Sequence, residues 1–139
     1  MDKVLVDTSA WIEFFRKKEP YYSIVLKLID DDLVSCIGIV LAELLQGAKS
    51  VKELNTIKEF LHVFDFLPES VTSWEKAGEL SYALKQKGKT VGLSDCYIAV
   101  LAGSSNVRLL TLDKHFDVLK KETDLKLYDF LRKQVRRDA

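Results

Sequence analysis

The sequence predicts a single α/β domain in which a mainly parallel sheet of about five short strands is flanked by helices. Short β-branched apolar runs alternate along the chain with longer segments whose apolar residues recur at helical spacing. No Pro-, Gly- or Ser-rich linker, low-complexity tract or internal repeat divides the 139 residues. We therefore expect one domain over residues 1–131, followed by a short basic tail over residues 132–139.

The N-terminal half opens with a buried strand at residues 4–6, which ends at Asp7. We expect Thr8 or Ser9 to cap the helix that follows, because hydroxyl oxygens accept hydrogen bonds from the free N–H groups of a first helical turn. Apolar periodicity predicts three more helices in this half, over residues 22–29, 38–47 and 51–61. Two further strands are expected over residues 33–37 and 63–67.

The C-terminal half continues the alternation of strands and helices. The pattern predicts helices over residues 70–88, 96–102 and 116–119, and strands over residues 107–112 and 125–128. Ser94 is expected to cap the second of these helices, and residues 103–106 have the composition of a turn. The clearest strand of the chain ends at Asp113.

The composition excludes several classes of protein. Lys and Arg number 21 and Asp and Glu also number 21, so the formal net charge of +0 excludes a strongly basic nucleic-acid-coating protein. Hydrophobic residues at 47% exclude a disordered chain. Cys36 and Cys96 lie in apolar surroundings and are expected to be free buried thiols. The longest apolar stretch is interrupted by Glu43 and cannot span a bilayer, so we expect a cytoplasmic protein without a membrane partner.

Four acidic residues are placed to meet at one edge of the predicted sheet. Asp7 and Asp113 follow strands, whereas Glu43 and Asp95 lie in the first turns of helices. In open α/β sheets, ligands bind in the crevice beyond the carboxyl ends of the strands, so all four acids can point into the same crevice. Taken singly, Asp7 could be a helix cap, Asp95 could complement a helix dipole and Asp113 could be a turn residue.

Glu43 and Asp95 carry the stronger signal, because apolar residues surround both of them in their helices. A buried carboxylate is costly unless it has a cation, a hydrogen-bonding partner or a proton. Four acids in one crevice would also repel one another and raise each other's pKa. A divalent cation resolves both conflicts, and Mg²⁺ and Mn²⁺ prefer carboxylate and water oxygens. The residues therefore predict an acidic metal site suited to phosphoryl chemistry.

Each acid lies in a short motif, and the motifs follow one another along nearly the whole chain. They read VLVDTSAWI at 4–12, LAELLQG at 41–47, LSDCYIA at 93–99 and LLTLDKHF at 109–116. Each motif alone is weak, but the ordered set of four resembles the PIN domain family, and within it most closely the VapC-type toxins of toxin–antitoxin systems. The resemblance implies a PIN-like fold and metal-dependent endoribonuclease activity on RNA, with hydrolysis leaving a 5′-phosphate.

The resemblance also implies the residues of the site. The catalytic carboxylates, which would hold one or two ions of Mg²⁺ or of Mn²⁺ as its substitute, are Asp7, Glu43, Asp95 and Asp113. The supporting polar residues are Thr8, Ser9 and Thr111. Asp117, one helical turn past Asp113, would assist as a second acid does in some relatives. His62 and His115 match no family position, so we expect His62 to be structural and His115 to be a solvated turn residue.

RNA binding by a chain without net charge requires local basic clusters. The candidate phosphate contacts are Arg16, Lys17, Lys85, Lys87 and Lys89. Both clusters lie on segments that lead into or out of the acidic crevice, so we expect them to flank it, although each alone is also typical of a solvated helix end. The resemblance further implies an antitoxin protein as partner and a homodimer. The candidates for a partner surface, or for the core, are the aromatic residues Trp11, Phe14, Phe15, Tyr21 and Tyr22.

Other interpretations stay open. A PIN-fold nuclease could process RNA outside toxin–antitoxin systems, and a catalytically inactive PIN-type module could only bind a partner. A haloacid-dehalogenase phosphatase would need a second acid at the position of Ser9. A response-regulator receiver domain would place no acid inside a helix in the manner of Glu43, so these two classes fit less well.

Overall fold

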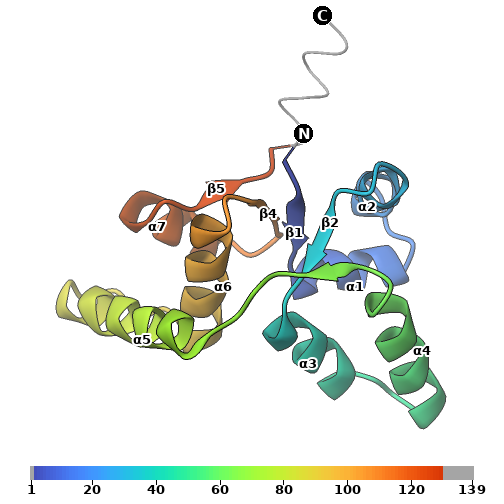
Figure 1. Cartoon of the computed structure of the whole chain (residues 1–139), viewed down its shortest axis with the longest axis horizontal. Coiled ribbons are helices and arrows are strands. Elements are labelled where there is room, and N and C mark those ends of the chain that lie inside the picture. The colour runs from blue at the N-terminus through green and yellow to red at the C-terminus, as the bar shows by residue number, and fades with distance from the viewer. Residues whose placement is uncertain (1, 130–139) are drawn as a thin grey trace, which may run out of the picture.

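The computed structural model describes residues 2–129, and these form the predicted α/β fold with a parallel sheet (Figure 1). The strands are β1 (Val4–Val6), β2 (Val34–Cys36), β3 (Asp65–Phe66), β4 (Arg108–Leu110) and β5 (Lys126–Leu127). The helices are α1 (Thr8–Phe15), α2 (Tyr21–Asp30), α3 (Gly38–Gln46), α4 (Val51–Leu61), α5 (Val71–Gln86), α6 (Leu93–Ser104) and α7 (His115–Glu122). The predicted basic tail over 132–139 and the domain boundary at 131 lie outside the described residues.

The sheet has the strand order β3-β2-β1-β4-β5, and every neighbouring pair is parallel. β1 is the central strand, with Val4 opposite Val34 of β2 on one side and opposite Arg108 of β4 on the other. Because all strands run in the same direction, the residues that follow β1, β2 and β4 emerge at one edge of the sheet. This is the edge at which the sequence predicts a site.

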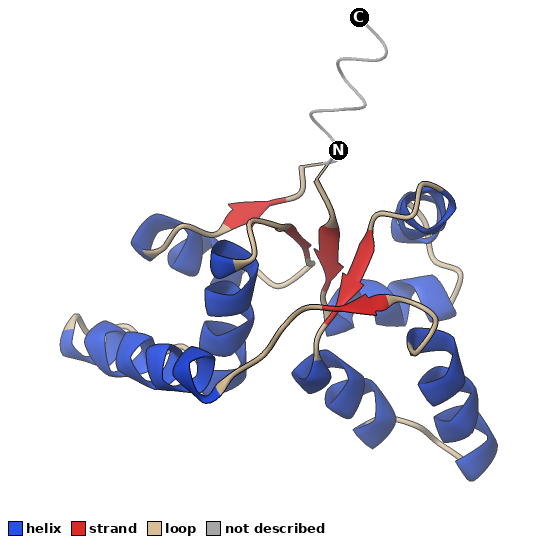
Figure 2. Ribbon diagram, in the orientation of Figure 1, coloured by secondary structure: helices blue, strands red, loops and turns tan. Residues whose placement is uncertain are grey.

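The helices form two groups on either side of the central strands (Figure 2). α1 contacts α2 and α3, and α3 contacts α4, whereas α6 contacts both α5 and α7. The three residues of β1 are at most 1% exposed, so both faces of this strand are covered, as in parallel sheets generally. Trp11 is fully buried and its ring lies 5.7 Å from those of Phe14 and Phe64, which makes it part of the core, while Phe15 stays 38% exposed.

Two helix starts differ from the sequence prediction. The N-cap of α1 is Asp7 and that of α6 is Gly92, so the predictions that Thr8 or Ser9 caps α1 and that Ser94 caps α6 are wrong. In both cases the serine or threonine lies inside the first helical turn. For Thr8 and Ser9 the reason is visible in the contacts, because their hydroxyls donate to carboxylates of the site and accept no hydrogen bond from the first turn of α1. The predicted turn at 103–106 is also shorter, since α6 continues through Ser104.

Ser70 caps α5, and its hydroxyl accepts a hydrogen bond from the N–H of Ser73. Cys36 and Cys96 are buried free thiols, which confirms that prediction. Among residues 2–129, no helix is long and apolar enough to cross a membrane.

Candidate active site

Asp7 follows β1 directly and, at 6% exposed, is the most deeply buried of the four candidate acids. Its backbone carbonyl accepts hydrogen bonds from the N–H groups of Ala10 and Trp11, which begins α1 at this point. Its Oδ2 atom accepts hydrogen bonds from the hydroxyls of Ser9 at 3.0 Å and of Thr111 at 2.7 Å. The carboxylate is therefore held in one orientation by groups from two different segments of the chain.

The same two hydroxyls connect Asp7 to the loop that carries Asp113. The hydroxyl oxygen of Ser9 accepts a hydrogen bond from the N–H of Leu112 at 3.0 Å. That of Thr111 accepts one from the N–H of Asp113, also at 3.0 Å. Ser9 and Thr111 thus couple the ends of β1 and β4.

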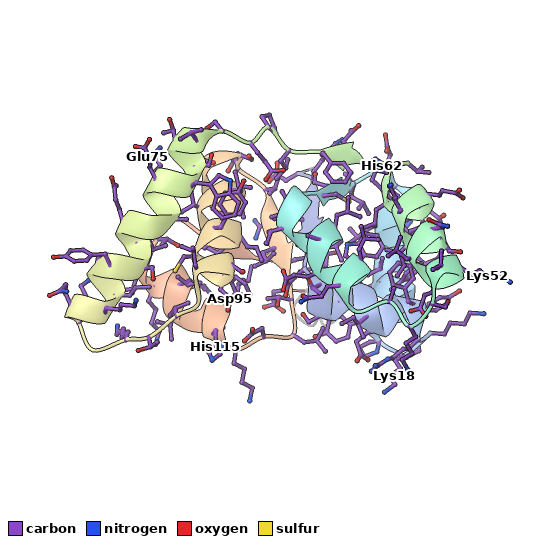
Figure 3. All side chains as sticks on the ribbon, turned by 90° about the horizontal axis from the view of Figure 1, so that it is seen from below. Lys18, Lys52, His62, Glu75, Asp95 and His115 are labelled. Atoms are coloured by element: carbon purple, nitrogen blue, oxygen red, sulfur yellow. The ribbon has the colours of Figure 1, made fainter. Side chains whose placement is uncertain are left out.

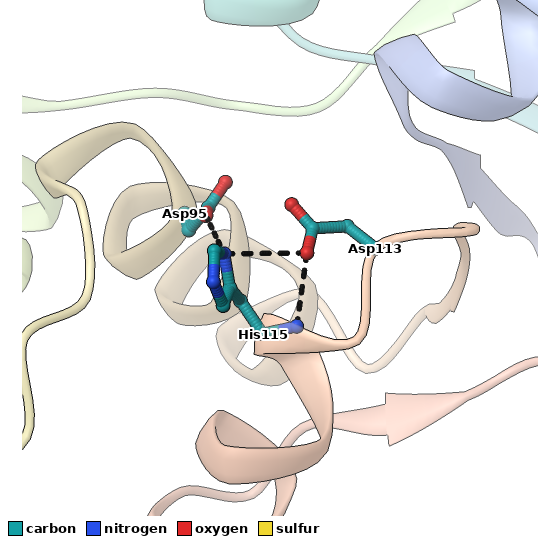
Figure 4. Close-up of side chains that lie close together, drawn as sticks. All are labelled: Asp95, Asp113 and His115. Carbon is teal, nitrogen blue, oxygen red and sulfur yellow. Dashed lines mark hydrogen bonds and ion pairs between the residues drawn. The ribbon is translucent and has the colours of Figure 1, made fainter.

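Asp95, Asp113 and His115 form a tight group at this edge of the sheet (Figure 4). Asp95 lies in the first turn of α6, Asp113 follows β4, and His115 begins α7. The imidazole Nδ1 lies 3.3 Å from Oδ1 of Asp113 and 3.8 Å from Oδ2 of Asp95. The backbone N–H of His115 also donates to Oδ1 of Asp113 at 2.9 Å, so the turn itself brings the ring to the carboxylates.

Glu43 lies on α3 and faces the same crevice from the other side. Figure 3 looks onto the carboxyl ends of the strands and shows Asp95 and His115 as neighbours there. Glu43 is half-buried, and its Oε1 accepts a hydrogen bond from the hydroxyl of Thr8 at 3.3 Å. Arg16, which directly follows α1, and Glu43 line the same pocket of about 270 Å³.

Mutual repulsion links the four acids electrostatically. Burial and the neighbouring carboxylates of Asp7 and Asp95 raise the pKa of Glu43 above its ordinary value, although the hydrogen bond from Thr8 opposes this effect. Burial and the carboxylates of Asp113 and Asp7 likewise raise the pKa of Asp95. The acids from α3, α6 and the strand ends therefore lie close enough for each charge to oppose the others, as the sequence predicts.

The chemistry of these donors fits a divalent cation. Within residues 2–129, the ligand atoms of Asp95, Asp113 and His115 form a group in which all lie within 4.8 Å of one another. Burial, and then the neighbouring carboxylates, raise the pKa of Glu43 and of Asp95, so a cation in the crevice would favour the charged form of both. Asp7 and Glu43 would complete an oxygen-rich set around an ion held by that group.

His115 is the residue that sequence reasoning missed. The sequence predicts a solvated turn residue, and although the side chain is 69% exposed, its ring lies against two candidate metal ligands. The missed signal is the Asp-x-His spacing at the start of a helix, where an aspartate that accepts the N–H two residues later brings that residue beside it. Asp117 is exposed in the first turn of α7 and lies outside the group formed by Asp95, Asp113 and His115.

The two candidate RNA-binding clusters differ in how free their charges are. Lys87 and Lys89 both form ion pairs with Glu122 of α7, at 2.7 Å and 2.8 Å. These hydrogen bonds hold the pKa of Glu122 at about 2, well below its ordinary value. The pairs tie the segment between α5 and α6 to α7, whereas Arg16 is exposed and lines the pocket beside Glu43.

Glu69 joins the two helices that carry Glu43 and Asp95. One of its carboxylate oxygens accepts a hydrogen bond from the N–H of Gly38, at the start of α3, at 3.0 Å. The other accepts one from the hydroxyl of Tyr97 on α6, two residues after Asp95. A side chain at Gly38 would lie 3.3 Å from this carboxylate, so glycine leaves room for the contact.

A parallel sheet with acids converging at its carboxyl edge is the arrangement expected of a PIN domain. The chain belongs to the PIN domain family, whose model matches residues 4–122. It is 33% identical over 131 residues to Ribonuclease VapC1 of Methanocaldococcus jannaschii, a match that covers 91% of this chain and 88% of that protein. It is 29% identical over 133 residues to Ribonuclease VapC11 of Mycobacterium tuberculosis, covering 91% of this chain and 98% of that one.

Solved structures share the fold. VapBC2 from Rickettsia felis, bound to a DNA fragment from its promoter, matches with a TM-score of 0.71 and 25% identity, covering 90% of this chain and 96% of that one. DNA-bound VapBC from Salmonella typhimurium matches with a TM-score of 0.73 and 24% identity, over 93% and 98% of the two chains. These likenesses agree with the fold class that the sequence predicts.

Proposed function

We propose that this chain is a metal-dependent endoribonuclease that hydrolyses RNA phosphodiester bonds, and that it is the toxin of a toxin–antitoxin pair. The observation that carries the proposal is the convergence of Asp7, Glu43, Asp95 and Asp113 at one edge of a PIN-family sheet. Relatives named ribonucleases, which align with 91% of the chain, support the reaction class. A complete set of acids argues against an inactive binding module.

The proposed catalytic centre consists of the four carboxylates and one or two ions of Mg²⁺ or Mn²⁺. A bound divalent cation supplies stabilisation of phosphate charge and a water of lowered pKa. Asp7 is held in a fixed orientation by Ser9 and Thr111, so little reorganisation is needed when its charge is engaged. Thr8 orients Glu43 in the same way, with a single hydrogen bond.

Arg16 and Lys17 are the favoured RNA phosphate contacts in this proposal. Arg16 lines the pocket that contains Glu43, so a phosphate there would lie next to the acidic centre. Lys85, Lys87 and Lys89 remain candidates, but the pairing of Lys87 and Lys89 with Glu122 reduces the positive charge that this cluster offers. Because the net charge is +0, we expect RNA binding to be weak and sensitive to salt.

The proposed partners are RNA, an antitoxin protein and a second copy of the chain. The antitoxin is supported by the similarity to VapBC2 of Rickettsia felis and to VapBC-5 of Mycobacterium tuberculosis, a member of the VapBC family of toxin–antitoxin systems. The exposed apolar side chains of Ile12 and Phe15 rim the pocket at Glu43 and offer a contact surface for such a protein. We place the protein in the cytoplasm, where RNA and a co-expressed antitoxin are available.

Cleavage of mixed RNA by the purified full-length chain tests the reaction. With Mg²⁺ or Mn²⁺ we expect fragments that carry 5′-phosphates, and we expect EDTA to stop the reaction. Asp7→Asn keeps the size of the side chain but removes its charge, and should lower the cleavage rate by about 100-fold or more. Asp30→Asn, at the exposed end of α2, is the matched control and should cleave normally.

Two outcomes would contradict the proposal in different ways. Cleavage that survives both EDTA and Asp7→Asn would exclude a mechanism that depends on a metal and these carboxylates. Bacterial growth that continues normally when the active chain is expressed without other genes would exclude the toxin role, while leaving the nuclease intact. In that case RNA processing outside a toxin–antitoxin system becomes the better assignment.

A further inference from the structure

His115 lies where a ligand of the proposed metal would have to lie. Its Nδ1 atom is 3.3 Å and 3.8 Å from carboxylate oxygens of Asp113 and Asp95. Neighbouring ligands of a six-coordinate Mg²⁺ or Mn²⁺ are about 3 Å apart, so the three donors need only small movements to bind one ion. The His115 side chain is 69% exposed, which leaves the ring room to adjust.

The backbone fixes the position of this histidine independently of its ring. The N–H of His115 donates to Asp113 at 2.9 Å, and the N–H of Asp113 donates to Thr111, which itself holds Asp7. The histidine is therefore attached through two hydrogen-bonded residues to the most rigidly held acid of the site. Any side chain at position 115 would begin beside Asp113, and in this chain that side chain is an imidazole.

We propose that His115 is a nitrogen ligand of the divalent cation in this active site and that it makes the site prefer Mn²⁺ over Mg²⁺. This inference rests on the proposed function. Both ions prefer oxygen donors, but Mg²⁺ binds them almost exclusively, whereas Mn²⁺, a first-row transition metal, also accepts an imidazole nitrogen beside carboxylates. A site with only carboxylates would accept either ion, and replacing one oxygen donor by an imidazole raises the affinity for Mn²⁺ relative to that for Mg²⁺.

The chain provides its own control, because it contains only two histidines. The second, His62, caps the C-terminal end of α4 and its ring stacks on Phe66 at 5.8 Å. The experiment uses full-length protein without a histidine tag, loaded with one equivalent of Mn²⁺. Pulsed electron paramagnetic resonance then detects any ¹⁴N nucleus bound to the ion. We expect the ¹⁴N modulation in the wild type and in His62→Gln, and its loss in His115→Gln.

Binding titrations with each ion measure the preference directly. His115→Gln should lower the affinity for Mn²⁺ by about tenfold or more and leave that for Mg²⁺ nearly unchanged. His115→Asp, which replaces the imidazole by a carboxylate, should lower the ratio of Mn²⁺ to Mg²⁺ affinity relative to the wild type. Equal losses of both ions in His115→Gln would overturn the inference, because they indicate damage to the site as a whole.

The failure of this inference can be told apart from failure of the proposed function. Mn²⁺ that binds and supports RNA cleavage without ¹⁴N modulation in the wild type would remove His115 from the ligand set and leave the nuclease intact. Modulation that persists in His115→Gln would do the same. If the wild type neither binds Mn²⁺ nor cleaves RNA, the proposed function and the inference both fail.

Discussion

The four acids of the site come from two kinds of location, and the structure treats them differently. Asp7 and Asp113 stand in the loops after strands, where hydroxyl and backbone donors surround them. Asp7 accepts two hydroxyl hydrogen bonds, and Asp113 accepts the N–H of His115. Glu43 and Asp95 stand on helices, where burial and neighbouring carboxylates raise the pKa of both, and Glu43 accepts one side-chain hydrogen bond, from Thr8.

This difference suggests a division of roles. The strand-end acids are held in place by the fold, because loops leave backbone donors and hydroxyls free to bind them. The helix acids are placed by rigid backbone but have few hydrogen bonds to compensate their charge, so they are the part of the site that favours a cation most strongly. The hydrogen bonds at the strand ends thus fix the positions of Asp7 and Asp113, whereas the charges of Glu43 and Asp95 on the helices favour the binding of a cation.

Neutralising the helix acids is the most direct way to test this division. We expect Glu43→Gln and Asp95→Asn each to lower RNA cleavage by about 100-fold or more, because each removes a proposed catalytic charge. In EDTA, however, each variant should unfold at a temperature about 3 °C higher than the wild type, because the substitution removes a charge that is disfavoured by burial and by the neighbouring carboxylates. Thermal unfolding of the metal-free proteins measures this.

The matched control is Glu59→Gln, on the exposed face of α4, which removes one negative charge away from the site. It should change neither the cleavage rate nor the unfolding temperature. If Glu43→Gln and Asp95→Asn instead lower the unfolding temperature of the metal-free protein, the charges of Glu43 and Asp95 do not destabilise it. The proposed difference between the helix acids and the strand-end acids is then wrong.

The sequence predicts the strand-end acids well, because a short apolar run that stops at an acid specifies both the strand and the edge at which it ends. It predicts Glu43 and Asp95 from their apolar neighbours, although Glu43 is only half-buried and shares its pocket with Arg16. The sequence does not predict contacts between segments that lie far apart along the chain. Nothing near Lys87 in sequence indicates that Glu122, 35 residues away, neutralises it.

The N-cap of α1 is predicted wrongly from the sequence for a related reason. A hydroxyl after a strand usually caps the next helix, and the local pattern does not show that a carboxylate competes for it. Ser9 bonds to Asp7, whose own partner Thr111 is more than 100 residues away in sequence. At Ser9 the hydrogen bonds of the tertiary structure therefore override the preference of a serine to cap the helix that follows a strand. Such exceptions to local preference are common at functional sites.

Removing a donor from a strand-end acid should have a smaller effect than removing a helix charge. Thr111→Val keeps the shape of the side chain but deletes the 2.7 Å hydrogen bond to Asp7 and the 3.0 Å hydrogen bond from the N–H of Asp113. We expect metal affinity and cleavage to fall by about 10- to 100-fold, which is typical of groups that orient a ligand without binding the ion. Metal titration and initial rates measure this.

Thr56→Val is the control for that variant. Thr56 is exposed on α4 and its hydroxyl donates to the carbonyl of Lys52, so the same chemical change is made away from the site. Its metal affinity and cleavage should match those of the wild type. Equal behaviour of the two valine variants would mean that Asp7 does not depend on its hydroxyl donors, and the strand ends would lose their proposed role in fixing position.

The smallest expected effect is a pH dependence that only the helix acids produce. Glu43 and Asp95 have folded-state pKa values above the ordinary 4.5 and 3.8, so the folded state takes up protons before the unfolded state does. The stability of the metal-free protein should therefore rise as pH falls through the folded-state values, and the gain should be complete below the ordinary ones. Between pH 8 and pH 5 the contribution of Glu122 is constant, because its lowered pKa affects stability only near and below 4.5.

The double variant Glu43→Gln/Asp95→Asn isolates this pH dependence, because it lacks both titrating groups. We expect it to lose the slope, so that its advantage in unfolding temperature over the wild type shrinks by about 1–2 °C from pH 8 to pH 5. Thermal unfolding of both metal-free proteins across this range measures the difference. If this difference in unfolding temperature stays constant from pH 8 to pH 5, neither acid takes up a proton in the folded state in that range. The proposed electrostatic difference between the helix acids and the strand-end acids would then be wrong.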